Sequence, residues 1–145
     1  MNTPTATTVS RKTVIKRRKA LLEFFRTTKV QRCTSTLQRG KKVCAVGGAA
    51  LIANIPMYNE PDHPKFVGEQ VDYQAQRAAY QEWEHLNEVT YERVRDYYGF
   101  TEDETIPDGN RTWDEYMVEL NDSDNLTFKK IADKLEKMGF LNVGA

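Results

Sequence analysis

The chain has 145 residues, of which 39% are hydrophobic and 29% are charged, and its formal net charge is zero at pH 7. This length and composition are typical of one soluble domain that can bury a core. The longest apolar run, residues 43–53, is shorter than the ~20 residues that cross a bilayer, and the N-terminus has no apolar stretch of the secretory kind. We therefore expect no membrane partner. With only two cysteines, we expect a reducing cytoplasm.

The zero net charge hides a division of the chain into a basic and an acidic part. Residues 1–42 contain twelve lysines and arginines and one acid, Glu23, so they carry a charge of +11. The remaining residues contain nine bases and twenty acids and carry −11. Either the basic part lies on the acidic part and the charges partly cancel, or it binds nucleic acid or another anionic surface. The sequence leaves both interpretations open.

Residues 1–10 are rich in threonine and lack apolar periodicity, so we expect a flexible tail. Residues 11–29 form the first predicted helix, and the hydroxyl of Ser10 is its expected N-cap. Arg18 interrupts the apolar stripe of this helix, and Phe24 lies off it. The stripe consists of Val14, Ile15, Leu21, Leu22 and Phe25.

Residues 43–55 are the most apolar segment and allow two interpretations. In the first, residues 43–46 form a short strand, and Gly47 and Gly48 form a turn before a helix. In the second, which we prefer, a buried helix spans the whole segment and the glycines mark a close packing contact. The four alanines of the segment favour the helix, because alanine is a poor strand former.

A long helix, residues 71–98, is predicted after a proline-rich loop. Its apolar residues recur at helical spacing on one face, which consists of Ala75, Ala79, Trp83, Leu86, Val94 and Tyr97.

Two shorter helices complete the chain. Residues 112–120 begin with Thr112 and Glu115 in the spacing of a capping box, and residues 127–138 begin with Thr127 as N-cap. The sequence therefore predicts a mainly α fold, a compact single domain of about five helices with a flexible basic N-terminal region.

Cys44 is the first candidate for chemistry, because unpaired amides at a helix start stabilise a thiolate. A nucleophilic cysteine also needs a base, and the sequence brings neither His63 nor His85 close to it. A small buried residue is the better interpretation of Cys44. Glu60, Asp62 and His63 match no metal-ligand spacing, so we predict neither a metal site nor a cofactor.

The basic first helix is the strongest candidate for a binding surface. Lysine and arginine clustered on one helix favour an anionic partner, either a protein or a nucleic acid, and self-association is also possible. The predicted partner-binding residues are Arg11, Lys12, Lys16, Arg17, Arg18, Lys19, Phe24, Arg26, Lys29 and Arg32.

Two segments resemble a known family. Residues 43–49, Val-Cys-Ala-Val-Gly-Gly-Ala, resemble the Cys-Ala-Leu-Gly-Ala segment of small uncharacterised proteins of bacteriophages and prophages. Residues 120–122, Leu-Asn-Asp, and residues 127–133, Thr-Phe-Lys-Lys-Ile-Ala-Asp, resemble the Asn-Asp turn and closing helix of these proteins. The resemblance implies a phage origin and a helical core, and it transfers no catalytic residue. We expect Asn121 and Asp122 to bond backbone amides in the turn between two helices.

The function that we predict is a non-enzymatic interaction protein of phage type. It would act in the host cytoplasm and bind a host or phage macromolecule through the basic helix. Two alternatives remain open. One is a virion or assembly component whose basic arm orders on neighbouring subunits or DNA, and the other is an enzyme that uses Cys44.

Overall fold

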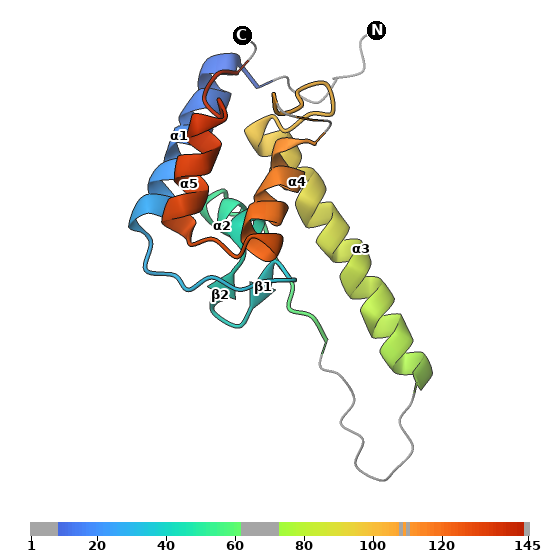
Figure 1. The fold of residues 1–145 in the computed structure, drawn as a ribbon. Coiled ribbons are helices and arrows are strands. Elements are labelled where there is room, and N and C mark those ends of the chain that lie inside the picture. Colours follow the sequence, from blue (N-terminus) through green and yellow to red (C-terminus); the bar gives the residue numbers. More distant parts are fainter. Residues whose placement is uncertain (1–8, 62–72, 108, 110, 144–145) are drawn as a thin grey trace, which may run out of the picture.

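The computed structural model describes residues 9–61, 73–107, 109 and 111–143 (Figure 1). Its elements follow in the order α1 (Arg11–Thr27), β1 (Gln38–Arg39), β2 (Lys42–Val43), α2 (Ala45–Ile52), α3 (Tyr73–Tyr98), α4 (Trp113–Val118), the π-helix η1 (Glu119–Ser123) and α5 (Phe128–Lys137). The five α-helices of these residues confirm the predicted mainly α fold. Residues 1–8, most of the expected tail, and His63 lie outside the described residues.

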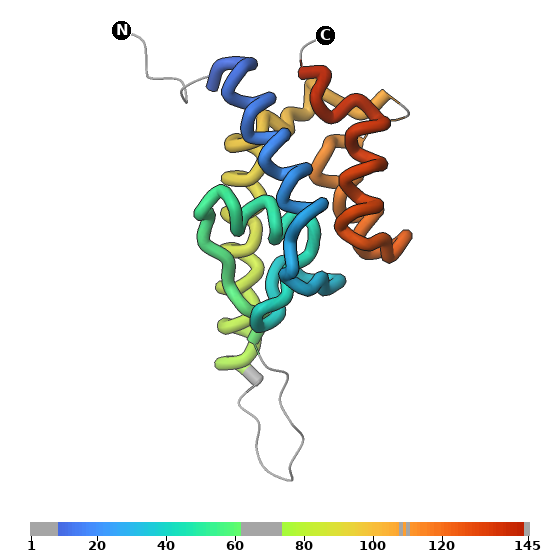
Figure 2. Tube along the Cα trace, turned by 90° about the vertical axis from the view of Figure 1, so that its left-hand side faces the viewer, coloured from blue at the N-terminus to red at the C-terminus, as the bar shows by residue number. Residues whose placement is uncertain are grey.

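Helices α1 and α5 lie side by side and run in opposite directions, as both views show (Figures 1 and 2). The rings of Phe25 and Phe128 stack across this contact, with their centroids 5.2 Å apart. Helix α2 packs against α1, α3 and α4. Every α-helix contributes to one buried core, which includes Leu21, Leu22, Phe25, Val46, Ala49, Val94, Tyr98, Met117, Ile131 and Leu135.

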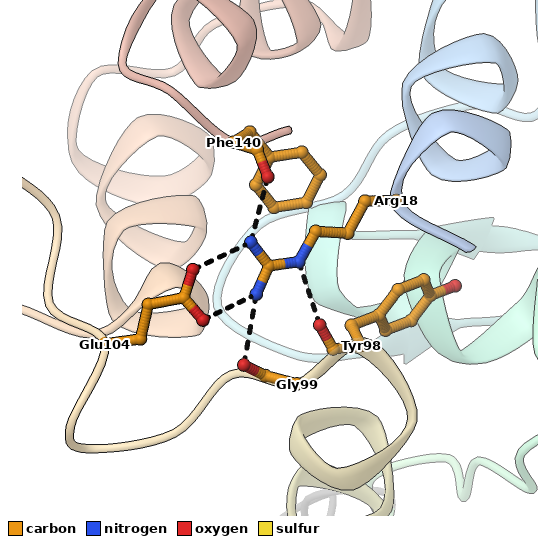
Figure 3. Close-up of polar contacts among 5 residues, drawn as sticks. All are labelled: Arg18, Tyr98, Gly99, Glu104 and Phe140. Carbon is orange, nitrogen blue, oxygen red and sulfur yellow. Dashed lines mark hydrogen bonds and ion pairs between the residues drawn. The ribbon is translucent and has the colours of Figure 1, made fainter. Parts of the chain in front are cut away.

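Arg18 interrupts the predicted stripe of α1, but its side chain is completely buried and extends the packed face. Its Nε donates to the carbonyl of Tyr98 at 2.9 Å, and its Nη1 and Nη2 donate to the carbonyls of Phe140 and Gly99 at 2.9 and 3.0 Å. Both Nη atoms also bind the carboxylate of Glu104 at 3.1 Å (Figure 3). The guanidinium thus uses its five N–H donors, and it joins α1 to the end of α3 and to the turn after α5.

The segment 43–55 combines parts of both sequence interpretations. Val43 pairs with Gln38 in a short antiparallel hairpin, which was not among the predicted elements. Cys44 then caps α2, so the helix begins at Ala45 and ends at Ile52. The predicted buried helix is confirmed, but the expected bounds 43 and 55 were wrong, because residues on both sides of the helix take other conformations.

Gly47 and Gly48 lie where other segments approach α2 closely. A Cβ atom at Gly47 would lie 2.0 Å from the carbonyl oxygen of Leu37, and one at Gly48 would lie 2.8 Å from the ring of Phe24. Both glycines therefore have a packing reason inside the helix. Their partners are α1 and the segment that leads into β1.

Helix α3 extends away from α1 and α5 along its first half (Figure 1). The predicted apolar face holds only near its end, where Val94 is buried, whereas Ala75 and Ala79 are exposed. Trp83 is half-buried, and its Nε1 donates to the carbonyl of Tyr58 at 3.0 Å. The segment around Tyr58, rather than the core, therefore contacts the middle of this helix.

The predicted helix 112–120 changes its hydrogen-bonding pattern before it ends. Thr112 and Glu115 form the predicted capping box, the α-helical part ends at Val118, and η1 follows. Thr127 caps α5 as expected, because its hydroxyl accepts from the amide of Lys130 at 3.3 Å. The predicted end at residue 138 lies one residue beyond the observed one.

Asn121 of η1 links three segments of the core. Its Nδ2 donates to the carbonyl of Cys33 at 2.9 Å, and its Oδ1 accepts from the amide of Ala45 at 3.0 Å. Asp122 accepts from the amide of Ser35 at 3.1 Å. The expected backbone bonds of this pair exist, but they reach a segment distant in the sequence instead of their own turn.

Candidate interaction surface

Four of the ten predicted partner-binding residues form one exposed cationic surface on α1. Arg11, Lys12, Lys16 and Lys19 are exposed, and none of them has a salt bridge or a side-chain hydrogen bond to another described residue. We call these four residues the basic face. Lys29 is also exposed, but it lies beyond the end of α1.

Arg17 and Arg26 are held by contacts within the fold. Arg17 donates to the carbonyl of Tyr97 at 3.0 Å, and its guanidinium carbon lies 3.9 Å from the centroid of the Tyr97 ring. Arg26 bridges to Asp133 and Glu136 of α5 at 3.4 and 3.0 Å. These bonds fix the position of α1 against α3 and α5.

Three more predicted residues make contacts within the fold. Arg18 has no exposed side-chain surface, so its assignment to a binding surface was wrong. Phe24 is half-buried, with its ring centroid 6.2 Å from that of Phe128, and Arg32 donates to the carbonyl of Asn121 at 2.8 Å. Sequence reasoning overestimated the surface because it counted charges without knowing which side chains the core would use.

An open depression of about 580 Å³ lies along the basic face, and the half-buried Ile15 lines it together with the four cations. The aliphatic stems of lysine side chains cover apolar surface while their ammonium groups stay in water. The depression therefore combines an apolar base with a charged rim, which is the arrangement of many protein interfaces.

The first turn of α1 contains Arg11 and Lys12 and no acidic residue. A helix N-terminus carries partial positive charge, so cations there are unfavourable for the helix itself. The stability of α1 therefore does not explain why these residues are basic.

The hairpin carries three further exposed cations that the predicted set omitted. Arg39, Lys41 and Lys42 lie at its tip and form no salt bridge with a described residue. They belong to the same basic part of the sequence, and the pairing of β1 with β2 brings Arg39 opposite Lys42. A hairpin signal around Gly40 could have found them.

Helix α3 carries an exposed surface of opposite charge. Glu84, Glu88, Glu92 and Asp96 recur at every fourth residue, are exposed, and form no salt bridge with a described residue. We call this row the acidic ladder. It shows that the basic and acidic parts of the chain do not neutralise one another completely within the described fold.

Both cysteines are buried and free. The Sγ of Cys44 accepts from the amide of Gly47 at 3.3 Å, and burial raises the pKa of its thiol to about 12. Burial also raises the pKa of Cys33. Both thiols are therefore in the neutral form at pH 7, which is the unreactive form.

Within the described part of the chain, no group of three His, Cys, Asp or Glu side chains is placed to hold a metal ion. Of the residues weighed for a metal, Asp62 and His63 lie outside that part. No helix in the described ranges is long and apolar enough to span a membrane.

Comparisons with protein-family models, with curated proteins and with solved structures find no match for this chain.

Proposed function

We propose that this chain is a non-enzymatic interaction protein of phage type that acts in the host cytoplasm and binds an acidic protein surface through the basic face of α1. The observation that carries the proposal is the unneutralised state of Arg11, Lys12, Lys16 and Lys19 among the described residues. Exposed cations without an internal partner steer association with an oppositely charged surface.

The placement of the cations supports a binding role over a folding role. Arg11 and Lys12 oppose the dipole of their own helix, whereas Arg17, Arg18 and Arg26 hold α1 in place. The helix thus has separate sets of cations for its own packing and for its solvent face.

Ile15 favours a protein partner over nucleic acid. It lines the same depression as the four cations, whereas the phosphates that receive most contacts in a nucleic-acid complex are charged and give an apolar side chain no favourable contact. An acidic protein surface with one apolar side chain matches both the rim and the base of the depression.

The test is affinity capture from infected cells with a tagged chain, followed by identification of the bound protein. The triple variant Lys12→Glu, Lys16→Glu and Lys19→Glu should lose the partner, and nuclease treatment should leave it bound. A matched control, Lys129→Glu, Lys130→Glu and Lys134→Glu, reverses three exposed lysines of α5 and should retain the partner.

Circular dichroism must show equal helix content in all three proteins before capture is compared. Retention of the partner by the basic-face variant would contradict the proposal. Loss of the partner after nuclease treatment would assign the basic face to nucleic acid instead.

The enzyme alternative has weaker support. Cys44 is buried, and its raised pKa leaves almost no thiolate at neutral pH. Its observed bonds suit an N-cap of α2, since its Sγ accepts a backbone amide of the first turn.

A further inference from the structure

The acidic ladder of α3 borders a groove of about 370 Å³ that is lined by Glu84, Asn87, Glu88, Tyr91 and Arg95. Two of these side chains, Glu84 and Glu88, are exposed carboxylates on the acidic ladder.

Among the described residues that line this groove, the one cation is Arg95, and it already has an acidic partner. Arg95 donates to the buried carboxylate of Asp114 at 2.8 Å, so it does not offset the charges of Glu84 and Glu88. The groove therefore offers the carboxylates of Glu84 and Glu88 to a ligand that carries N–H donors. A lysine or arginine side chain has that chemistry.

The chain itself carries a cationic helix whose dimensions match. Arg11 to Lys19 and Glu84 to Glu92 each span eight residue steps, which is about 12 Å of α-helix at about 1.5 Å per residue. Ile15 lies within the cationic row, and the half-buried ring of Tyr91 lies in the acidic groove. An apolar contact can therefore accompany the ion pairs.

No residue of the basic face forms a salt bridge with a residue of the acidic ladder in the described fold. Arg17 and Arg18 bind the carbonyls of Tyr97 and Tyr98, which fixes α1 at the C-terminal end of α3. Glu88 lies nine residues before Tyr97, about 14 Å along the helix axis at about 1.5 Å per residue. The first half of α3 extends away from α1 (Figure 1).

We propose that the basic face of one copy of this chain docks on the acidic ladder of a second copy. This rests on the proposed function and names a partner for the same surface. The proposal is carried by the charge complementarity of two rows, on helices of the same chain, that no described residue neutralises. Used once per copy, this contact is heterologous and builds a chain or a ring, whereas used twice and reciprocally between two copies it closes a two-fold dimer.

The test is sedimentation velocity of the purified full chain over a range of concentrations. At about 50 mM salt the chain should form oligomers that grow with concentration. At about 500 mM salt the dissociation constant should rise at least about tenfold, because the Debye length then falls well below 10 Å.

Two charge-reversal variants make the test specific. One is Lys12→Glu, Lys16→Glu and Lys19→Glu, and the other is Glu84→Lys, Glu88→Lys and Glu92→Lys. Each variant alone should be monomeric at low salt, because its two rows then repel each other. An equimolar mixture should associate again, since each reversed row meets its complement on the other variant.

The α5 control Lys129→Glu, Lys130→Glu and Lys134→Glu should associate like the unmodified chain. A monomeric unmodified chain at low salt, or a mixture of the two variants that stays monomeric, would overturn the proposal. If the unmodified chain is monomeric but the basic-face variant still loses its partner in affinity capture, only the second-copy inference fails. If the chains associate as expected and no other partner depends on the basic face, self-assembly is the function of that face.

Discussion

Arg18 and Lys19 are neighbours in the sequence and have opposite surroundings. Arg18 is completely buried and each of its N–H donors has an acceptor, whereas Lys19 is exposed and has no described partner. Adjacent residues of a helix point about 100° apart, so one side chain faces the core and the next faces water. The charge count of a helix therefore combines two groups of cations, one that holds the fold together and one that remains available to a partner.

The buried cation is stable only because its surroundings are complete. Burial lowers the pKa of Arg18, and the hydrogen bonds and charge of Glu104 oppose that effect. The rings of Phe100 and Phe140 have their centroids 5.2 and 5.1 Å from the guanidinium carbon and add cation–π contacts. A buried charge that loses part of such a network leaves other groups unpaired.

We expect the largest loss of stability from Arg18→Ala. This change leaves the carbonyls of Tyr98, Gly99 and Phe140 without their donor, so the free energy of unfolding should fall by about 3–5 kcal/mol. Urea unfolding followed by circular dichroism measures the change. Glu104→Gln should cost less, about 1–3 kcal/mol, because the backbone acceptors of Arg18 remain.

The matched control is Lys19→Ala, which should change stability by no more than about 0.5 kcal/mol. If Arg18→Ala lowered the free energy of unfolding as little as Lys19→Ala does, the buried network would contribute nothing to folding. The distinction between the two groups of cations would then disappear.

The sequence predicted the helices better than it predicted the partners of their side chains. The periodicity of α1 and the caps Ser10, Thr112 and Thr127 follow from local chemistry, and the structure has all of them. The burial of Arg18 depends on acceptors eighty or more residues away in the chain, which no local pattern indicates.

The candidate surface was predictable only in outline. The division of charge pointed to the basic N-terminal part of the chain, but four of the predicted cations are bound within the fold: Arg17, Arg18 and Arg26 of α1, and Arg32 beyond its end. The exposed acids of α3 follow a simple spacing of four residues in the sequence. Their significance depends on the way α3 extends from the core, because a packed helix would have buried or paired them.

The burial of Cys44 should make the stability of the protein depend on pH. Burial raises the pKa of Cys44 from 9.0 to about 12, so the folded chain keeps a proton that the unfolded chain releases. The resulting stability is complete below about pH 9 and is lost as the pH rises toward about 12. Across that window the free energy of unfolding should fall by up to about 1.4 kcal/mol per pH unit.

Cys33, Tyr91 and Tyr98 also have raised pKa values and act in the same direction. The informative quantity is therefore the difference in the free energy of unfolding between the unmodified chain and Cys44→Ala, measured from about pH 8 to about pH 10.5. The variant should show a shallower loss of stability with pH. Identical slopes for the two proteins would contradict a shielded, neutral thiol at this N-cap.

The smallest effect on stability is expected for the exposed cations of the basic face, and the sign of that effect matters more than its size. Lys12→Glu places a carboxylate in the first turn of α1, where no acid exists, so thermal unfolding should show a gain of about 0.3–1 kcal/mol. Lys19→Glu lies near the middle of the helix, outside the reach of the dipole, and should leave stability nearly unchanged. Both changes should nevertheless weaken association through the basic face, because each removes a cation and adds an anion. A stabilised but binding-deficient Lys12→Glu would mean that this cation is kept at a cost to its own helix. A destabilised Lys12→Glu would instead place Lys12 with Arg18, among the cations on which the fold depends.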